Sequence, residues 1–137
     1  TDVFDAGELP FFCADPSFES LVLIVLPELV RRKMGVLAMK SLSNGGFFGG
    51  DKQFCHGPHP LLVPERVSIE EAVSYTWSHP VSVLITGADN ADQLQEKIEI
   101  ARRFRPLAVS DMQTLVDRVS DRAGNIVEFY KREVATT

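Results

Sequence analysis

Gly35-Val36-Leu37-Ala38-Met39 gives the clearest indication of the fold of this 137-residue chain. An apolar run of this length is too short for a helix and is typical of a strand buried on both faces of a parallel sheet. Gly35 and the polar pair Lys40-Ser41 mark its two ends. The stretch therefore predicts a parallel sheet, which requires further strands elsewhere in the chain.

Two other apolar runs are candidates for the neighbouring strands. One covers residues 8–13 and the other covers residues 81–85. Helical patterns separate the three runs, and this alternation is typical of βα units built around a parallel sheet. With 45% apolar residues the chain is able to bury a core. The sequence therefore predicts an α/β fold with about three parallel strands and helices, in one domain that spans residues 1–137.

Two helices are expected in the first part of the chain. Residues 17–33 place apolar side chains three and four positions apart. Pro27 either kinks this helix or starts a second one, and the restart is the preferred interpretation. Ser68-Ile69-Glu70-Glu71 has the pattern of a capping box, in which a serine and a glutamate three residues later satisfy the first backbone N–H groups. This motif predicts the start of a helix that ends at His79-Pro80.

Two more helices are expected in the last part of the chain. Asn90 is the predicted cap of a helix that runs over residues 91–104. Its buried stripe is expected to consist of Leu94, Ile98 and Ala101. Ser110-Asp111-Met112-Gln113 is expected to open a last amphipathic helix that stops at Gly124.

Charge and hydropathy exclude several classes of partner. The net charge is -5 and no basic run is present, so we do not expect nucleic acid as a partner. The longest apolar run, residues 21–26, is far shorter than the roughly 20 residues that cross a bilayer. No secretory signal opens the chain, and Cys13 and Cys55 show no disulfide framework. We therefore expect a cytoplasmic protein with reduced thiols and no membrane partner.

The most promising local site is the strand-turn-helix at residues 83–90. Gly87 allows a ligand to approach the backbone closely, and the free N–H groups at the start of the next helix favour an anion. Barrel enzymes bind phosphate on the loops that follow their last strands, which fits this position. The alternative is an ordinary turn in which Asn90 only caps the helix, and the carboxylate of Asp89 disfavours a phosphate beside it.

Other reactive residues do not form a recognisable catalytic motif. The glycine-rich residues 44–50 either cover a cofactor or form an ordinary loop, because they lack both the GxGxxG and the P-loop spacing. Cys55, His56 and His59 are possible zinc ligands, but no second cluster completes four-coordination, and no metal site is predicted. Lys40 is more typical of a solvated strand end than of a Schiff-base lysine. No catalytic residue is assigned.

A series of segments resembles the last part of the aldo/keto reductase family. The segments occur in consistent order between Asp5 and Arg105. They are Leu26-Pro27-Glu28-Leu29-Val30, then Gly35-Val36-Leu37-Ala38-Met39-Lys40-Ser41-Leu42, Ser68-Ile69-Glu70-Glu71-Ala72, Val83-Leu84-Ile85-Thr86-Gly87 and Gln93-Leu94-Gln95-Glu96. The resemblance implies the C-terminal portion of a (β/α)8 TIM barrel that reduces a small-molecule carbonyl substrate, an aldehyde or ketone, with NADPH.

The resemblance also assigns roles to single residues. Met39 falls where many members place a tyrosine against the nicotinamide. Lys40, Ser41, Leu42 and Ser43 match the loop that passes the pyrophosphate. Gly87, Ala88 and Asn90 match the loop that holds the adenosine phosphate, and Gln93, Glu96 and Lys97 lie on the following helix. The family usually has arginine where Gln93 stands and often lysine at Gly87, so NADP and NAD both stay open as cofactors.

Two functions are compatible with the sequence. In this family the proton-donating tyrosine and its aspartate, lysine and histidine partners lie on earlier strands, which this chain lacks. The chain is then the cofactor-binding part of a reductase whose catalytic groups are supplied elsewhere. The alternative is a non-catalytic partial barrel that associates with itself and binds nucleotide. Both predict a homo-oligomer, because three strands leave two open edges and exposed apolar faces.

Overall fold

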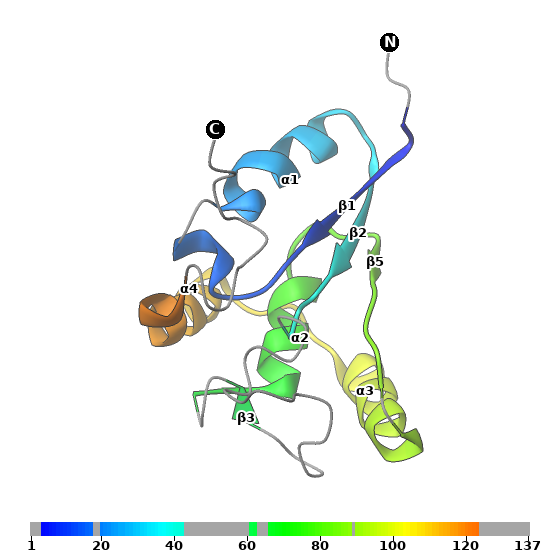
Figure 1. The fold of residues 1–137 in the computed structure, drawn as a ribbon, viewed down its shortest axis with the longest axis vertical. Helices are drawn as coiled ribbons and strands as arrows, with labels where there is room; N and C mark the ends of the chain where they lie inside the picture. Colours follow the sequence, from blue (N-terminus) through cyan, green and yellow to red (C-terminus); the bar gives the residue numbers. More distant parts are fainter. Residues whose placement is uncertain (1–3, 18–19, 43–60, 63–65, 89, 124–137) are drawn as a thin grey trace, which may run out of the picture.

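The computed structural model describes residues 4–17, 20–42, 61–62, 66–88 and 90–123. Three parallel strands form the main sheet, in the order β1 (Ala6–Pro10), β2 (Gly35–Met39) and β5 (Val83–Leu84). Figure 1 shows these strands side by side, with helices between them along the chain. The predicted α/β class with three parallel strands is confirmed.

The three strands match the predicted runs to different degrees. β2 has the predicted bounds, since the apolar run and its two ends are local signals. β1 begins and ends earlier than residues 8–13, because the chain turns after Phe12 into a short 3-10 helix, η1 (Asp15–Ser17). β5 is shorter than residues 81–85, although backbone hydrogen bonds to β2 continue on both sides of it, from Ser82 N to Val36 O (2.8 Å) and from Ile85 N to Ala38 O (2.7 Å).

Helix α1 (Leu21–Arg31) is continuous through Pro27, so the predicted restart at this proline is wrong. A proline inside a helix removes the hydrogen bond to the carbonyl four residues earlier, which here belongs to Leu23. Pro27 and Leu23 both lie on the exposed side of α1. Water can therefore bind the released carbonyl, and the helix continues because its inner side chains Val22, Leu26 and Leu29 remain in the core.

Helix α2 (Ile69–Trp77) begins at the predicted capping box. The Glu71 N–H donates to Ser68 Oγ (3.1 Å), and the Ser68 N–H donates to the Glu71 carboxylate (2.8 Å). Ser68 is also the last residue of β4 (Val67–Ser68), which pairs antiparallel with β3 (Leu61–Leu62). The predicted helix start at the capping box is therefore confirmed, and a small second sheet precedes the helix.

Helix α3 (Ala91–Arg103) is capped as predicted, because Asn90 Oδ1 accepts a hydrogen bond from Gln93 N (2.9 Å). Its predicted buried stripe is wrong. Leu94 and Ile98 are 51% and 37% exposed and Ala101 is exposed, whereas Ile100 is buried. Ile100 packs with Ile69 and Val73 of α2, and the described residues provide no layer that covers the apolar stripe.

Helix α4 (Val109–Val119) begins earlier than predicted and is followed by η3 (Ser120–Arg122). Its N-cap is Ala108, which has no side-chain hydrogen bond to offer, so the predicted cap at Ser110 is wrong. Ser110 lies inside the first turn, where its carbonyl accepts from Thr114 Oγ1 (2.9 Å). The predicted end at Gly124 lies outside the described residues.

The helices cover one face of the sheet. Alternate residues of β1 and β2, among them Leu9, Val36 and Ala38, are buried in the main core with the inner side of α1. At Gly7 the packing is tight, since a Cβ there would lie 2.9 Å from a Leu29 methyl carbon. α1 therefore lies directly on the sheet, and the core sits between the sheet and its helices.

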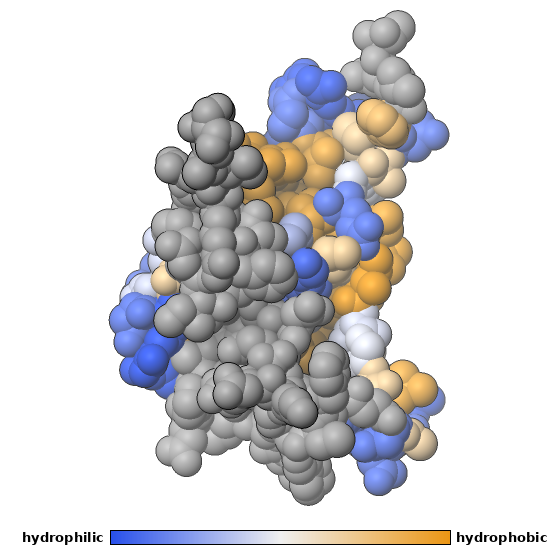
Figure 2. Space-filling view, viewed as in Figure 1, coloured by the Kyte–Doolittle hydropathy of each residue, from blue (hydrophilic) through white to orange (hydrophobic). Residues whose placement is uncertain are grey.

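The opposite face of the sheet is open. It carries the alternate residues of the same strands, which are half-buried or exposed: Ala6, Glu8, Pro10, Leu37, Met39, Val83 and Ile85. Val83 and Ile85 are 48% and 45% exposed. In Figure 2 apolar surface is exposed from the region of α1 down the side where β5 and α3 lie. We call these seven residues the open face.

Candidate functional site

The C-terminal ends of the three parallel strands lie at one edge of the sheet. Phe11 N donates to Met39 O (2.9 Å), and Ile85 N donates to Ala38 O (2.7 Å). The segments that follow β2 and β5 therefore leave the sheet side by side. Both groups of residues that the sequence analysis selected, around Lys40 and around Gly87, start from this edge. In parallel α/β proteins this is the edge where ligands bind.

In the group after β2, a residue with left-handed backbone conformation is followed by two residues that pack in or against the core. Met39 is half-buried at the end of the open face. Lys40 has a φ of 54°, in the left-handed region that residues other than glycine seldom adopt. Ser41 is buried and Leu42 packs against the main core, so these two residues hold the chain after the turn. Ser43 lies outside the described residues.

Lys40 is the residue of this group best placed for a ligand. Left-handed backbone at a non-glycine residue is found disproportionately at functional sites, because surrounding contacts must hold it in place. Ser41 and Leu42 supply such contacts here. Lys40 itself is partly buried at the strand end, where its ammonium group is a possible partner for an anion.

The group after β5 has open space beside its glycine. Gly87 and Ala88 are exposed, and a Cβ built at Gly87 would meet no other heavy atom within 4 Å. A ligand can therefore approach the backbone there without displacing a side chain. Lys97 Nζ donates a hydrogen bond to the Gly87 carbonyl oxygen, which ties this turn to α3. Asp89 lies outside the described residues.

The start of α3 provides polar groups close to this turn in the chain. Gln93, Glu96 and Lys97 are partly buried, so the residues that the resemblance placed near a cofactor lie on the inner side of the helix. The positive end of the helix dipole favours an anion at Asn90. Asp92 in the first turn acts in the opposite direction.

A buried carboxylate that the sequence analysis did not single out is structural. Asp15 accepts hydrogen bonds from Ser20 Oγ (2.6 Å), Val22 N (2.9 Å) and Leu21 N (3.2 Å). These bonds satisfy N–H groups at the start of α1, which would otherwise be buried without partners. The signal in the sequence was an aspartate ahead of a serine at a helix start. It was overlooked because Asp15 and Ser20 are five residues apart.

The buried residues with nucleophilic or acid-base chemistry lie in the core. Desolvation raises the pKa of the Cys13 thiol to about 12, so this residue is a protonated thiol and a poor nucleophile. Burial, followed by the neighbouring Cys13 and Asp15, raises the pKa of Tyr75 above its usual value of 10. Tyr75 is fully buried, so we do not assign it a proton-donor role.

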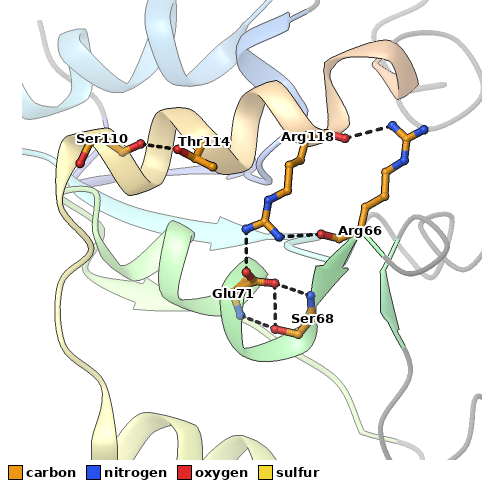
Figure 3. Close-up of polar contacts among 6 residues, drawn as sticks. All are labelled: Arg66, Ser68, Glu71, Ser110, Thr114 and Arg118. Carbon is orange, nitrogen blue, oxygen red and sulfur yellow. Dashed lines mark hydrogen bonds and ion pairs between the residues drawn. The ribbon is translucent and has the colours of Figure 1, made fainter.

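The most extensive polar cluster joins α2 to α4 (Figure 3). Arg118 donates to the Glu71 carboxylate (2.7 Å) and to Arg66 O (2.9 Å), while Arg66 donates to Arg118 O (3.0 Å). Arg66 also forms an ion pair with Asp121. Every group in this cluster has a partner within it. The cluster therefore explains how the helices are held together and offers no free group for chemistry.

The remaining candidates of the sequence analysis cannot be placed. Residues 44–50 and the possible zinc ligands Cys55, His56 and His59 lie outside the described residues. Within the residues that the structure does describe, no group of three or more potential ligands is close enough to hold a metal ion. Over the same residues, no helix combines the length and apolar character needed to cross a bilayer.

No protein-family model, curated protein or solved structure matches this chain. The resemblance to aldo/keto reductases therefore rests only on the short segments quoted above. Function has to be argued from those segments together with the geometry of the sheet and its C-terminal edge.

Proposed function

We propose that this chain is the C-terminal, cofactor-binding part of a (β/α)8 barrel reductase of the aldo/keto type. The observation that carries the proposal is a parallel sheet with strands in chain order, on which the helices of the described residues pack against one face. In such barrels the helices surround the strands, and the inner face of the strands packs in the centre. The open face, with Leu37 and Val83, would then be part of the barrel interior.

The C-terminal edge supports the same proposal. Active sites of (β/α)8 barrels lie at the C-terminal ends of the strands, where the segments with Lys40 and Gly87 lie here. When bound, NADPH or NADH would supply the hydride that reduces a carbonyl carbon. Met39 would lie against the nicotinamide, the Lys40–Ser41 segment beside the pyrophosphate, and Lys97 with the start of α3 at the adenosine phosphate.

Lys97 has the most specific role in this proposal. Its ammonium group already bonds to the Gly87 carbonyl oxygen, so it both shapes the turn and brings a positive charge to it. Because Gln93 stands where the family usually has arginine, Lys97 would be the main cationic partner on α3 for a phosphate. Removing its charge should weaken binding without affecting the core, since it is only partly buried.

Calorimetric titration of the chain with NADP and with NAD tests this proposal. We expect measurable binding of at least one of them, and a loss of about 10- to 150-fold in affinity in Lys97→Gln, since a charged hydrogen bond contributes roughly 1.5–3 kcal/mol. Lys33→Gln is the matched control, because Lys33 is an exposed lysine directly after α1. Absence of binding of either nucleotide, or equal losses in the two variants, would contradict the proposal.

A second function, a self-associating partial barrel without catalysis, is favoured by the open face. Parallel sheets are normally covered on both faces, and exposed apolar patches mark contact surfaces. Val83 and Ile85, on and directly after the outer strand β5, are about half exposed. A second copy of the chain is the simplest cover, which would make the protein a homo-oligomer.

Sedimentation velocity over a range of concentrations tests self-association. We expect the wild-type chain to form a dimer or larger oligomer, and Val83→Lys with Ile85→Lys to shift it to the monomer. The matched control is Leu23→Lys with Ile24→Lys, because these α1 side chains are even more exposed, at 63% and 70%, but lie away from the open face. A wild-type monomer at all concentrations would exclude this function.

A further inference from the structure

His79 lies between two aromatic rings at the end of α2. Its ring centroid is 4.9 Å from that of Phe11 and 4.9 Å from that of Tyr75, both in edge-on orientation. Its Nε2 atom is buried and has no hydrogen-bond partner. A buried polar nitrogen without a partner is rare in proteins and needs an explanation. The proposed cofactor site does not involve this residue, and neither do the ion pairs among the described residues.

The groups around His79 do not compensate a positive charge. Asp15 is the charged residue that acts on it, but the Asp15 carboxylate is already bound by Ser20 and by the start of α1. The other titratable residues of this cluster, Cys13 and Tyr75, remain neutral because burial raises both pKa values. A protonated imidazole would therefore have a buried N–H without an acceptor, which is unfavourable.

Hydrogen bonds link His79 to the C-terminal edge of the sheet. The Phe11 N–H donates to Met39 O (2.9 Å), and Thr76 Oγ1 donates to Phe11 O (3.3 Å). The backbone N–H of His79 donates to Thr76 O (3.2 Å), and the backbone N–H of Val81 donates to His79 O (2.7 Å). The backbone of His79 therefore joins α2 to the approach to β5, and its imidazole packs against Phe11 of the segment after β1 and Tyr75 of α2.

We propose that His79 is a pH-sensitive contact whose protonation loosens the packing of α2 against the C-terminal edge of the sheet. The neutral ring packs between Phe11 and Tyr75, whereas the charged ring would place an N–H group without an acceptor at the buried Nε2 position. Acidification would weaken the contact and with it the edge at Met39. This inference concerns the chain itself and does not depend on the proposed cofactor.

The sign of the effect follows from the pKa of His79. Burial lowers it below the usual value of 6.5, and Asp15 only partly opposes this shift. Below pH 6.5 the unfolded chain therefore binds a proton that the folded chain does not bind. The stability that the neutral ring provides is complete above that pH. It decreases as the pH falls towards the folded-state pKa and then levels off.

Denaturant unfolding between about pH 5 and pH 8, where histidine is the side chain that normally titrates, measures the effect. We expect the unfolding midpoint of the wild-type chain to fall on acidification, with up to a tenfold loss in the folding equilibrium constant per unit of pKa difference. His79→Phe keeps an aromatic ring between Phe11 and Tyr75 and should remove this dependence. His56→Gln with His59→Gln, which removes the other two histidines, should retain it.

A second measurement keeps the test decisive if His79→Phe does not fold. NMR titration of the imidazoles in the wild-type chain reports the His79 pKa directly, and we expect its midpoint to lie below 6.5. A His79 midpoint at or above 6.5 would overturn the proposal. So would equal pH dependence of stability in the wild type and in a folded His79→Phe variant.

Discussion

The two faces of the parallel sheet have similar side chains but very different surroundings. On the covered face, Val36 and Ala38 are 1% and 0% exposed beneath the helices, whereas Val83 on the open face is 48% exposed. In β2 the residues of both faces are apolar, so the strand has no polar side suited to water. The difference shows that apolar residues indicate a face suited to contact another apolar surface. They do not indicate whether the same chain provides that surface.

Truncation of one valine on each face should give the largest difference between them. Val36→Ala removes two buried methyl groups and leaves a cavity, so we expect a loss of about 2 kcal/mol in the free energy of unfolding. Val83→Ala removes the same atoms from a half-exposed position, and we expect a change within about 0.5 kcal/mol. Denaturant unfolding of the two variants at low protein concentration measures both values.

Similar losses of stability in the two valine variants would contradict the expected difference between the covered face and the open face. That result would mean that the open face is covered in solution even in dilute samples. Repeating the measurement at high protein concentration sharpens the test, because a cover provided by a second copy makes the cost at Val83 depend on concentration.

A smaller effect is expected at the ion pair that holds the covering helices together. Glu71 of α2 bonds to Arg118 of α4 (2.7 Å), and both side chains are partly exposed. Burial opposes ionisation of Glu71, but Ser68 and Arg118 outweigh it and lower its pKa below 4.5. We expect Glu71→Gln to cost about 1 kcal/mol near neutral pH, as measured by denaturant unfolding.

The pH dependence of that cost separates the charge from the packing. Because the folded-state pKa of Glu71 is lowered, its contribution is present above pH 4.5 and is lost as the pH falls below that value. The difference between wild type and Glu71→Gln should therefore shrink in acid. Glu70→Gln is the matched control, since Glu70 pairs with Arg103 in a more exposed position and should show a smaller cost. A pH-independent difference at Glu71 would show that the charge has no role.

The parts of the fold that could be predicted are those set by neighbouring residues. The capping box of α2 depends only on Ser68 and Glu71, and the cap of α3 depends only on Asn90 and Gln93. β2 was found from one apolar run with clear ends. Each of these signals lies within a few residues, so nothing elsewhere in the chain alters it.

The predictions that were wrong depend on which side of a helix faces the core. Pro27 was expected to start a second helix, but it lies on the solvent side of α1, where water can bind the carbonyl that loses its hydrogen bond. Leu94 and Ile98 have the spacing of a buried stripe, yet they are exposed because the described residues place nothing against them. Spacing shows that a helix has an apolar side, but the neighbouring layers decide which side is buried.

For the candidate site, local signals selected some residues, and residues with long-range contacts were not selected. Gly87, Asn90 and Lys97 were selected from the local turn and the resemblance, and the structure adds a hydrogen bond between Lys97 and the Gly87 carbonyl. Asp15 and His79 were missed as buried polar groups. Their surroundings are made by segments far apart in the chain, as when Phe11 packs on His79, and no local pattern signals such contacts.

The order of the strands has a consequence for how the protein forms during synthesis. Because β1, β2 and β5 are neighbours in the same sequence in which the ribosome produces them, each new strand adds to an edge that already exists. Among the described strands of this sheet, none has to be inserted between two earlier ones. The nascent chain can therefore add β1, β2 and β5 stepwise, with the last strand exposing a fresh edge until later segments emerge.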